Sequence, residues 1–207
     1  MLSESSVGQS VGHVRSVRVD ALASIGRIVE AAREALRRSS SATLNRIAED
    51  AGVGIATLYR HFPNRESLAA AVMDRVWAED VRPLLQEFGS SNASRDDLLS
   101  VAERVVGVFE AERGVVQALR NLPALVVDHL AQDASLRDTV ARAQAVGNLR
   151  PDLESDDVPS LLAMVTTLPF ILDAAPEERR RYLSLFLDGL NPARAVPLPA
   201  RSAGEER

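Results

Sequence analysis

The sequence predicts an all-α fold in which an N-terminal three-helix domain with a helix-turn-helix precedes a larger helical domain. Three observations lead to this class. Apolar residues recur at intervals of three and four, as at Leu22, Ile25 and Val29, which is the period of one helix face. No segment combines period-two alternation with hairpin turn residues. The chain has 207 residues, of which 46% are hydrophobic, so it can bury a substantial core.

Four helices are predicted in the first 90 residues, over residues 22–36, 43–50, 54–61 and 65–88. Residues 1–18 are rich in Ser, Gly and Val without a sustained period, so we expect a flexible leader there. Thr43 is suited to cap the second helix, and Gly52 to supply the left-handed turn after it. Pro83 is expected to kink or divide the fourth helix.

Further helices are predicted over 98–109, in pieces between 115 and 147, and over 158–173 and 177–190. Pro123 and residues 133–135 interrupt the helical period, so boundaries in that stretch are not fixed by the pattern. Beyond Asn191 the chain is rich in Pro, Ala and Arg, which predicts a flexible tail over 191–207.

The segment 43–61 fits a helix-turn-helix, in which the first short helix braces the second. Its packed positions are predicted to be Ile47, Ala48, Val53 and Leu58. The second helix then directs outward, or to its margin, Ile55, Ala56, Thr57, Tyr59, Arg60 and His61. Hydroxyl and imidazole groups can donate to phosphate oxygens, and Ile or Ala can contact a thymine methyl group. An alternative for Tyr59 is a partly buried ring that packs the three helices together.

Charge is distributed unevenly along the chain. Residues 1–77 contain 10 Arg and 8 acidic residues, a net charge of +2, whereas residues 78–207 contain 14 Arg and 21 acidic residues, a net charge of −7. The N-terminal third is therefore the better partner for a polyanion, although the surplus is small. Arg15 and Arg18 could enter a minor groove or lie in a solvated tail.

The stretch TLNRIAEDAGVGIATLYRHFPNRESLAAAV resembles the DNA-binding segment of the TetR family of bacterial transcriptional regulators. RIVEAAREAL resembles the first helix of that family, and GNLRPDLESDDVPSLL and RYLSLFLDGL resemble segments around its last helices. The resemblance implies a DNA-binding domain over 19–66 and a ligand-binding and dimerisation domain over 67–190. It further implies a regulator, most simply a repressor, that binds a palindromic operator as a homodimer and is released by a small-molecule effector.

The resemblance also implies roles for individual residues. Phosphate contacts are expected from Thr43, Arg46, Thr57, Tyr59, His61 and Arg65, and base contacts from Ile55, Ala56 and Arg60. Gly54 stands where relatives usually have a Ser or Thr cap, and Arg65 stands where they commonly have Lys. The loop 39–42 lacks a glycine that often ends the first helix in relatives, which leaves the local geometry open.

The larger domain is expected to supply the dimer interface and the effector pocket. The interface is predicted on the last two helices, at Leu161, Val165, Leu168, Leu172, Tyr182, Leu183, Phe186, Leu187 and Leu190; the alternative is that these residues only complete the core of one subunit. Candidate pocket residues are Trp77, Phe88, Phe109, His129, Met164 and Phe170, with core packing as the alternative.

Several classes of protein are excluded or disfavoured. The absence of cysteine excludes a disulfide framework, a thiolate metal site and a cysteine nucleophile. Asp128, His129 and Asp133 are too few for a metal site, and no catalytic or phosphate-binding motif is present, so neither an enzyme nor a cofactor is expected. No apolar run is long enough to span a bilayer, and a cytoplasmic protein is expected. The alternative to a regulator is a helical interaction module that acts through a protein partner.

Overall fold

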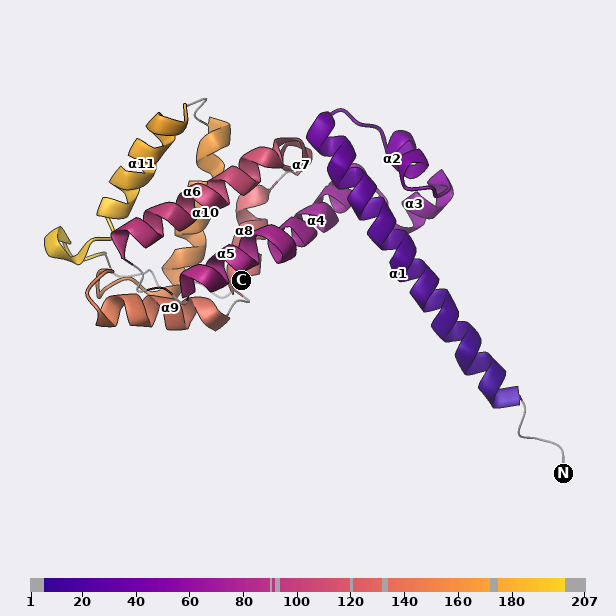
Figure 1. Ribbon diagram of the computed structural model, residues 1–207, viewed down its shortest axis with the longest axis horizontal. Coiled ribbons are helices and arrows are strands. Elements are labelled where there is room, and N and C mark those ends of the chain that lie inside the picture. The colour runs from indigo at the N-terminus through magenta and orange to yellow at the C-terminus, as the bar shows by residue number, and fades with distance from the viewer. Residues whose placement is uncertain are drawn as a thin grey trace. The chain divides into compact units, whose positions relative to one another are not determined.

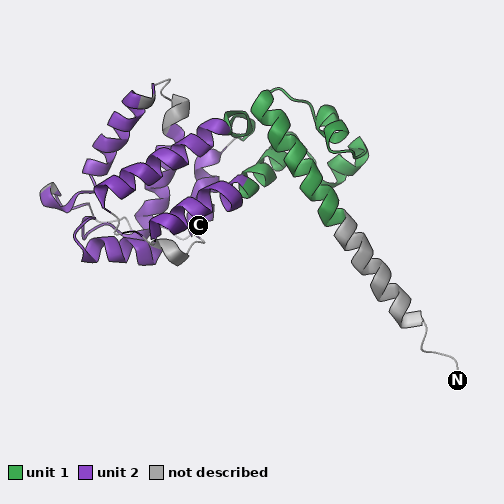
Figure 2. Ribbon diagram, in the orientation of Figure 1, with its two compact units in different colours: residues 1–75, 112–120 green, residues 76–111, 121–207 purple. Residues whose placement is uncertain are grey.

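The computed structural model describes residues 6–89, 91, 94–119, 121–131, 134–171 and 175–199, with side chains described from Ala21 onward except at 134–136, 168–171, 176 and 194. Over these residues the regular structure is helical and contains no strand, which confirms the predicted all-α class (Figure 1). The chain divides into two compact units (Figure 2). Unit 1 comprises residues 1–75 and 112–120, and unit 2 comprises residues 76–111 and 121–207.

Unit 1 is built from α1 (Ser6–Arg38), α2 (Leu44–Asp50), α3 (Ile55–His61), α4 (Arg65–Val76) and α7 (Arg113–Ala118). α1 packs against α2 and α7, and α2 packs against α3. The largest fully buried side chains of this unit come from four helices: Ile28, Leu36, Ile47, Leu58, Leu68, Val72 and Met73. Their positions follow the three-and-four spacing in the sequence, because that spacing places them on one face of each helix.

The start of α1 differs from the prediction. The helix begins at Ser6, so most of the predicted leader over 1–18 belongs to α1. No proline interrupts the chain between Ser6 and Arg38, and a helix nucleated by its buried half extends at little cost for each added residue. Arg15 and Arg18 lie on this extension, where side chains are outside the described set.

The junction between α2 and α3 is the predicted tight turn. Thr43 caps α2, with its Oγ1 accepting a hydrogen bond from the Arg46 N–H at 3.3 Å. Gly52 has φ +65°, a left-handed conformation that favours glycine. The sequence prediction of this helix-turn-helix is confirmed.

Unit 2 contains η1 (Trp77–Val81), α5 (Arg82–Gly89), α6 (Arg95–Ala111), α8 (Leu122–Ala131), α9 (Ala134–Ala145), η2 (Ser155–Asp157), α10 (Val158–Ile171), α11 (Pro176–Asp188) and η3 (Pro192–Arg194). α10 packs against α8 and α6, α11 packs against α6, and α5 packs against α6 and α9. One buried cluster joins α6, α10 and α11 through Leu99, Ala102, Val106, Val165, Leu183 and Leu187.

The predicted helix over 65–88 is divided by a π-helical turn. η1 follows α4 directly, and the Arg82 N–H donates to the Trp77 carbonyl five residues earlier. Pro83 then occupies the first turn of α5. A proline ring collides with the carbonyl four residues before it in a regular α-helix, and a wider turn relieves that collision.

The end of the described chain is held in place and is not the frayed tail that the composition predicts. The buried Arg150 guanidinium pairs with Asp152 at 2.6 Å and donates to the carbonyls of Gly189 and Val196. The Leu198 N–H donates to Asp152 Oδ2 at 2.9 Å. Hydrogen bonds from Arg150 and from the Leu198 N–H hold the pKa of the Asp152 carboxyl well below its usual range. We call this arrangement the Arg150–Asp152 clamp.

Candidate nucleic-acid interface

The outer face of α3 carries the side chains that the sequence predicts to contact nucleic acid. Leu58 is fully buried and anchors the helix, whereas Tyr59 is 50% exposed and Ile55 is 37% exposed. Ala56 and Arg60 are also exposed, and Thr57 and His61 are half-buried. Exposed Ile and Tyr beside Arg on one short helix are suited to contact base edges and phosphates together.

The Tyr59 side chain is half exposed and half covered by unit 1, so its exposed part is accessible to nucleic acid while the alternative of a partly buried ring that packs the three helices also stays open. Gly54 lies at the N-cap of α3 in an extended conformation and makes no side-chain cap. Leaving the first backbone N–H groups of α3 without a side-chain cap costs only a few tenths of a kcal/mol relative to Ser or Thr.

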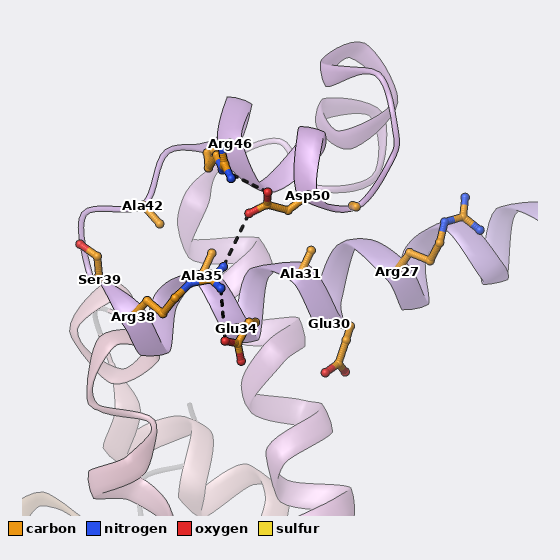
Figure 3. A pocket seen from close by; sticks show the side chains of 11 residues that line it. Arg27, Glu30, Ala31, Glu34, Ala35, Arg38, Ser39, Ala42, Arg46 and Asp50 are labelled. Carbon is orange, nitrogen blue, oxygen red and sulfur yellow. Dashed lines mark hydrogen bonds and ion pairs between the residues drawn. The ribbon is translucent and has the colours of Figure 1, made fainter.

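Arg46 on α2 is exposed, but its guanidinium already has an acidic partner. Its Nε lies 3.0 Å from Asp50 Oδ1, and the other Asp50 oxygen lies 3.7 Å from Arg38 on α1. Arg38 also pairs with Glu34 at 3.4 Å. Figure 3 shows this chain of ion pairs across a surface groove of about 790 Å³ between α1 and α2. A phosphate that binds Arg46 must compete with Asp50.

Arg65 at the start of α4 has a role that the sequence did not reveal. Its two terminal nitrogens donate to the carbonyls of Ser40 and Ala42, in the loop between α1 and α2. That loop delivers Thr43 to the N-terminus of α2. Arg65 therefore positions the loop that lacks the usual glycine, which differs from its predicted role as a phosphate contact.

Models of protein families match two segments of the chain. Residues 28–72 match bacterial regulatory proteins of the tetR family, and residues 93–192 match the C-terminal domain of SbtR-like transcriptional regulators. The chain belongs to the TetR family. It is a DNA-binding transcriptional regulator, with the helix-turn-helix of α2 and α3 as the DNA-binding element.

Solved structures agree with this assignment. A TetR transcriptional regulator from Streptomyces coelicolor is similar over 82% of this chain and 99% of its own, with 28% identity and a TM-score of 0.52. A putative TetR-family regulator from a Rhodococcus species shares the fold at 22% identity, with a TM-score of 0.53, over 81% of this chain and 98% of its own. A gamma-butyrolactone receptor shares it at 21% identity, with a TM-score of 0.52, over 84% and 91%. No curated protein sequence matches the chain.

Of the residues predicted to line an effector pocket in this TetR-family chain, Trp77 and His129 lie in contact, whereas Met164 lies on the surface. Trp77 and Phe109 are fully buried, and the Trp77 ring stacks on His129 at 5.0 Å between ring centroids. Met164 is 57% exposed, and the side chain of Phe170 lies outside the described set. Aromatic residues at helical spacing are most often core residues, and Trp77 and Phe109 follow that rule.

Unit 2 instead contains an apolar cavity of about 100 Å³ between α5, α6, α9, α10 and α11. Of the predicted pocket residues whose side chains are described, Phe88 lines it. Among the described residues that line the cavity no side chain is charged, and Thr139 is the one that carries a hydroxyl. No sequence pattern predicts this cavity, because its Leu, Val and Ala residues have the same spacing as ordinary core positions.

The predicted dimer interface divides into buried and accessible residues. Val165, Leu183 and Leu187 belong to the core cluster of unit 2, so they are not available to a partner. Leu161, Phe186 and Leu190 are half-buried, Tyr182 is 40% exposed, and the side chains of Leu168 and Leu172 are outside the described set. Among the described side chains of α10 and α11, the exposed large apolar ones are Met164, Tyr182 and Leu185.

Two predicted absences concern metal sites and membranes. Among the described residues no group of three or more His, Asp or Glu side chains could hold a metal ion, and Asp133 of the weak candidate lies outside them. No helix in the described parts of the chain is long and apolar enough to cross a membrane.

Proposed function

We propose that this TetR-family regulator is a repressor that binds a palindromic operator as a homodimer and is released by a small apolar effector. The observation that carries the proposal is the outer face of α3, where Ile55, Tyr59 and Arg60 are exposed on a helix fixed by the buried Leu58. One such helix reads few base pairs, and two copies related by a two-fold axis read an inverted repeat.

In this proposal Ile55, Ala56 and Arg60 contact base edges, and hydroxyl or imidazole groups of Thr43, Thr57, Tyr59 and His61 contact phosphates. Arg46 joins them when a phosphate displaces Asp50, whose carboxylate lies 3.0 Å away. Arg65 acts indirectly, because its guanidinium donates to the carbonyls of the loop before α2. The residues that read sequence and those that hold the backbone thus come from both α2 and α3.

The chemistry of the cavity in unit 2 supports an uncharged effector. A buried charge without a partner is strongly disfavoured, and the described residues that line the cavity carry no charged group. An apolar cavity of roughly 150 Å³ holds a benzene-sized molecule, so a cavity of about 100 Å³ is suited to a similarly small or slightly smaller apolar group. The same cavity is lined by Leu161 of α10 and Phe186 of α11, the helices proposed to form the dimer.

The DNA-binding part is tested by selecting bound sequences from a random duplex library, at near-physiological salt and with excess competitor DNA. Recovery of an inverted repeat supports a dimeric, sequence-specific regulator. Weak binding that disappears with salt, without a recovered sequence, would contradict it and would favour the interaction module that acts through a protein partner.

The effector part is tested separately with Ala102→Phe, which fills the cavity from α6. Benzene is the probe, and its binding is followed by the rise in thermal midpoint of unfolding that a ligand specific for the folded state produces. We expect benzene to stabilise the wild type and to have no effect on the filled variant. Equal stabilisation of both proteins would place the binding elsewhere and remove this effector assignment.

A further inference from the structure

Glu112 is the most deeply buried charged residue among those described, with no exposed surface. Its Oε1 accepts hydrogen bonds from Arg33 Nε at 2.8 Å and Arg37 Nε at 2.9 Å, and the Nη2 atoms of both arginines lie within 2.7 Å of the same oxygen. Arg33 is itself 9% exposed. Both arginines belong to α1, 79 and 75 residues from Glu112 in the chain.

Gly114, two residues further, brings the backbone of α7 directly against α1. A Cβ atom at this position would lie 1.9 Å from the Leu36 carbonyl oxygen and 2.8 Å from its carbonyl carbon. No side chain fits in that space, so glycine is required for the contact. The ion pairs and the close contact together fix the segment 112–120 on the C-terminal half of α1.

The segment 112–120 has an unusual place in the chain. It belongs to unit 1, whereas α6 before it and α8 after it belong to unit 2, as the colours in Figure 2 show. Unit 1 is therefore completed by the segment 112–120, which is joined through the backbone to α6 at one end and to α8 at the other. Any movement of α6 or α8 must either carry this segment along or detach it from α1.

The carboxylate of Glu112 is only half satisfied. Its Oε2 is buried and has no hydrogen-bond partner in the described structure. A buried ion pair with an unsatisfied oxygen stabilises a fold less than well-packed apolar residues of the same volume. The pairing is therefore weak evidence for a purely stabilising role.

We propose that Glu112 is a positioning residue that couples the DNA-binding unit to unit 2. Through Arg33 and Arg37 it holds α1, and through the chain it is attached to α6 and α8. Operator binding to unit 1 then changes the stability of α6 and α8 against local opening. By thermodynamic reciprocity, a displacement of those helices changes operator affinity. The inference rests on the proposed DNA binding.

The test compares hydrogen exchange of full-length protein with and without saturating operator, using the inverted-repeat duplex recovered by the selection above. In the wild type we expect the operator to change exchange protection in α6 and α8. In Glu112→Gln, which keeps the shape and removes the charge, we expect that change to be lost while the operator still binds. Glu110→Gln is the matched control, because it removes the charge from an ion pair with Arg179 at 2.7 Å only two residues away.

The double variant Arg33→Met/Glu112→Leu keeps the test decisive if Glu112→Gln folds poorly, since apolar replacement of a buried pair is often neutral or stabilising. Loss of the change in this folded variant supports the inference. Retention of the change in it, or the absence of any change in the wild type, overturns the inference and leaves a purely structural ion pair. Failure to recover an operator at all is instead a failure of the proposed function.

Discussion

At the scale of single residues, two arginines in or next to α3 are expected to have different roles, one in operator binding and the other in stability. Arg60 is exposed on α3, whereas Arg65 donates to two carbonyls of the loop before α2. We expect Arg65→Ala to lower the free energy of unfolding by roughly 1–3 kcal/mol, because two carbonyls lose a charged donor. Arg60→Ala should leave stability within about 0.5 kcal/mol and weaken the operator by about 1–3 kcal/mol.

Denaturant unfolding and operator titration of both variants check this division of roles. The salt dependence of operator binding gives a second distinction, because loss of a direct phosphate contact lowers the slope by about one. If Arg65→Ala kept wild-type stability and lowered that slope, Arg65 would be a phosphate contact and the positioning role would be wrong.

These residues also show what local sequence can reveal. The pairing of Arg46 with Asp50 follows from their i,i+4 spacing on a helix, and it was available from the sequence. The bonds from Arg65 to Ser40 and Ala42 span 25 and 23 residues, and those of Glu112 span more than 70. Contacts of that separation depend on how the helices pack, which no periodic pattern specifies.

At the scale of elements, two glycines provide a matched test of the contact between α7 and α1. Gly114→Ala places a methyl group 1.9 Å from the Leu36 carbonyl oxygen, whereas Gly107→Ala on α6 meets nothing within 4 Å. We expect Gly114→Ala to lower the free energy of unfolding by several kcal/mol, about the cost of a severe steric misfit. Gly107→Ala should raise it by about 0.5–1 kcal/mol, because alanine favours the helix.

Thermal or urea unfolding of the two variants measures these changes in the free energy of unfolding. A Gly114→Ala protein as stable as the wild type would mean that α7 does not pack closely on α1, and the coupling inference would lose one of its two supports.

The Arg150–Asp152 clamp predicts a pH dependence of stability. The pKa of Asp152 is lowered in the folded chain, so its contribution is present above the unfolded value of about 4 and falls as the pH drops below it. We expect Asp152→Asn to be less stable than the wild type at pH 7, with a difference that shrinks below about pH 4. Urea unfolding across this range checks the trend, with Asp96→Asn on α6 as a control of equal charge change. A difference that stays constant with pH would exclude the clamp as its origin.

The elements themselves were predictable to different degrees. Spacing, caps and Gly52 defined α2 and α3, because each signal acts within a few residues. Pro83 predicts a break in the helix near that residue. It does not predict the π-helical turn of η1, because the backbone that accommodates the proline ring depends on how the helix packs. The start of α1 at Ser6 is not predictable from periodicity, because apolar residues recur only weakly at helical spacing over residues 6–18.

At the scale of the whole molecule, apolar periodicity indicates that α10 and the second half of α11 carry many apolar residues, but not which of their faces is covered. Leu183 and Leu187, four residues apart, point into the core of unit 2. Tyr182 and Leu185, three apart, lie on the opposite, exposed side of α11. The proposed homodimer would cover this exposed side, and only the packing shows which side of the helix that is.

The exposed side of α11 gives the test of the proposed homodimer. Leu185 is 58% exposed, so Leu185→Asp should leave the fold of one subunit intact. It places a charge in an apolar interface, and we expect the solution mass at micromolar concentration to fall to that of a monomer and specific operator binding to be lost. Val146→Asp, at 61% exposure in the same unit, is the control and should change neither property. A Leu185→Asp protein that remained dimeric would place the interface on another surface, because a buried and unpaired aspartate is not tolerated at the centre of an apolar contact.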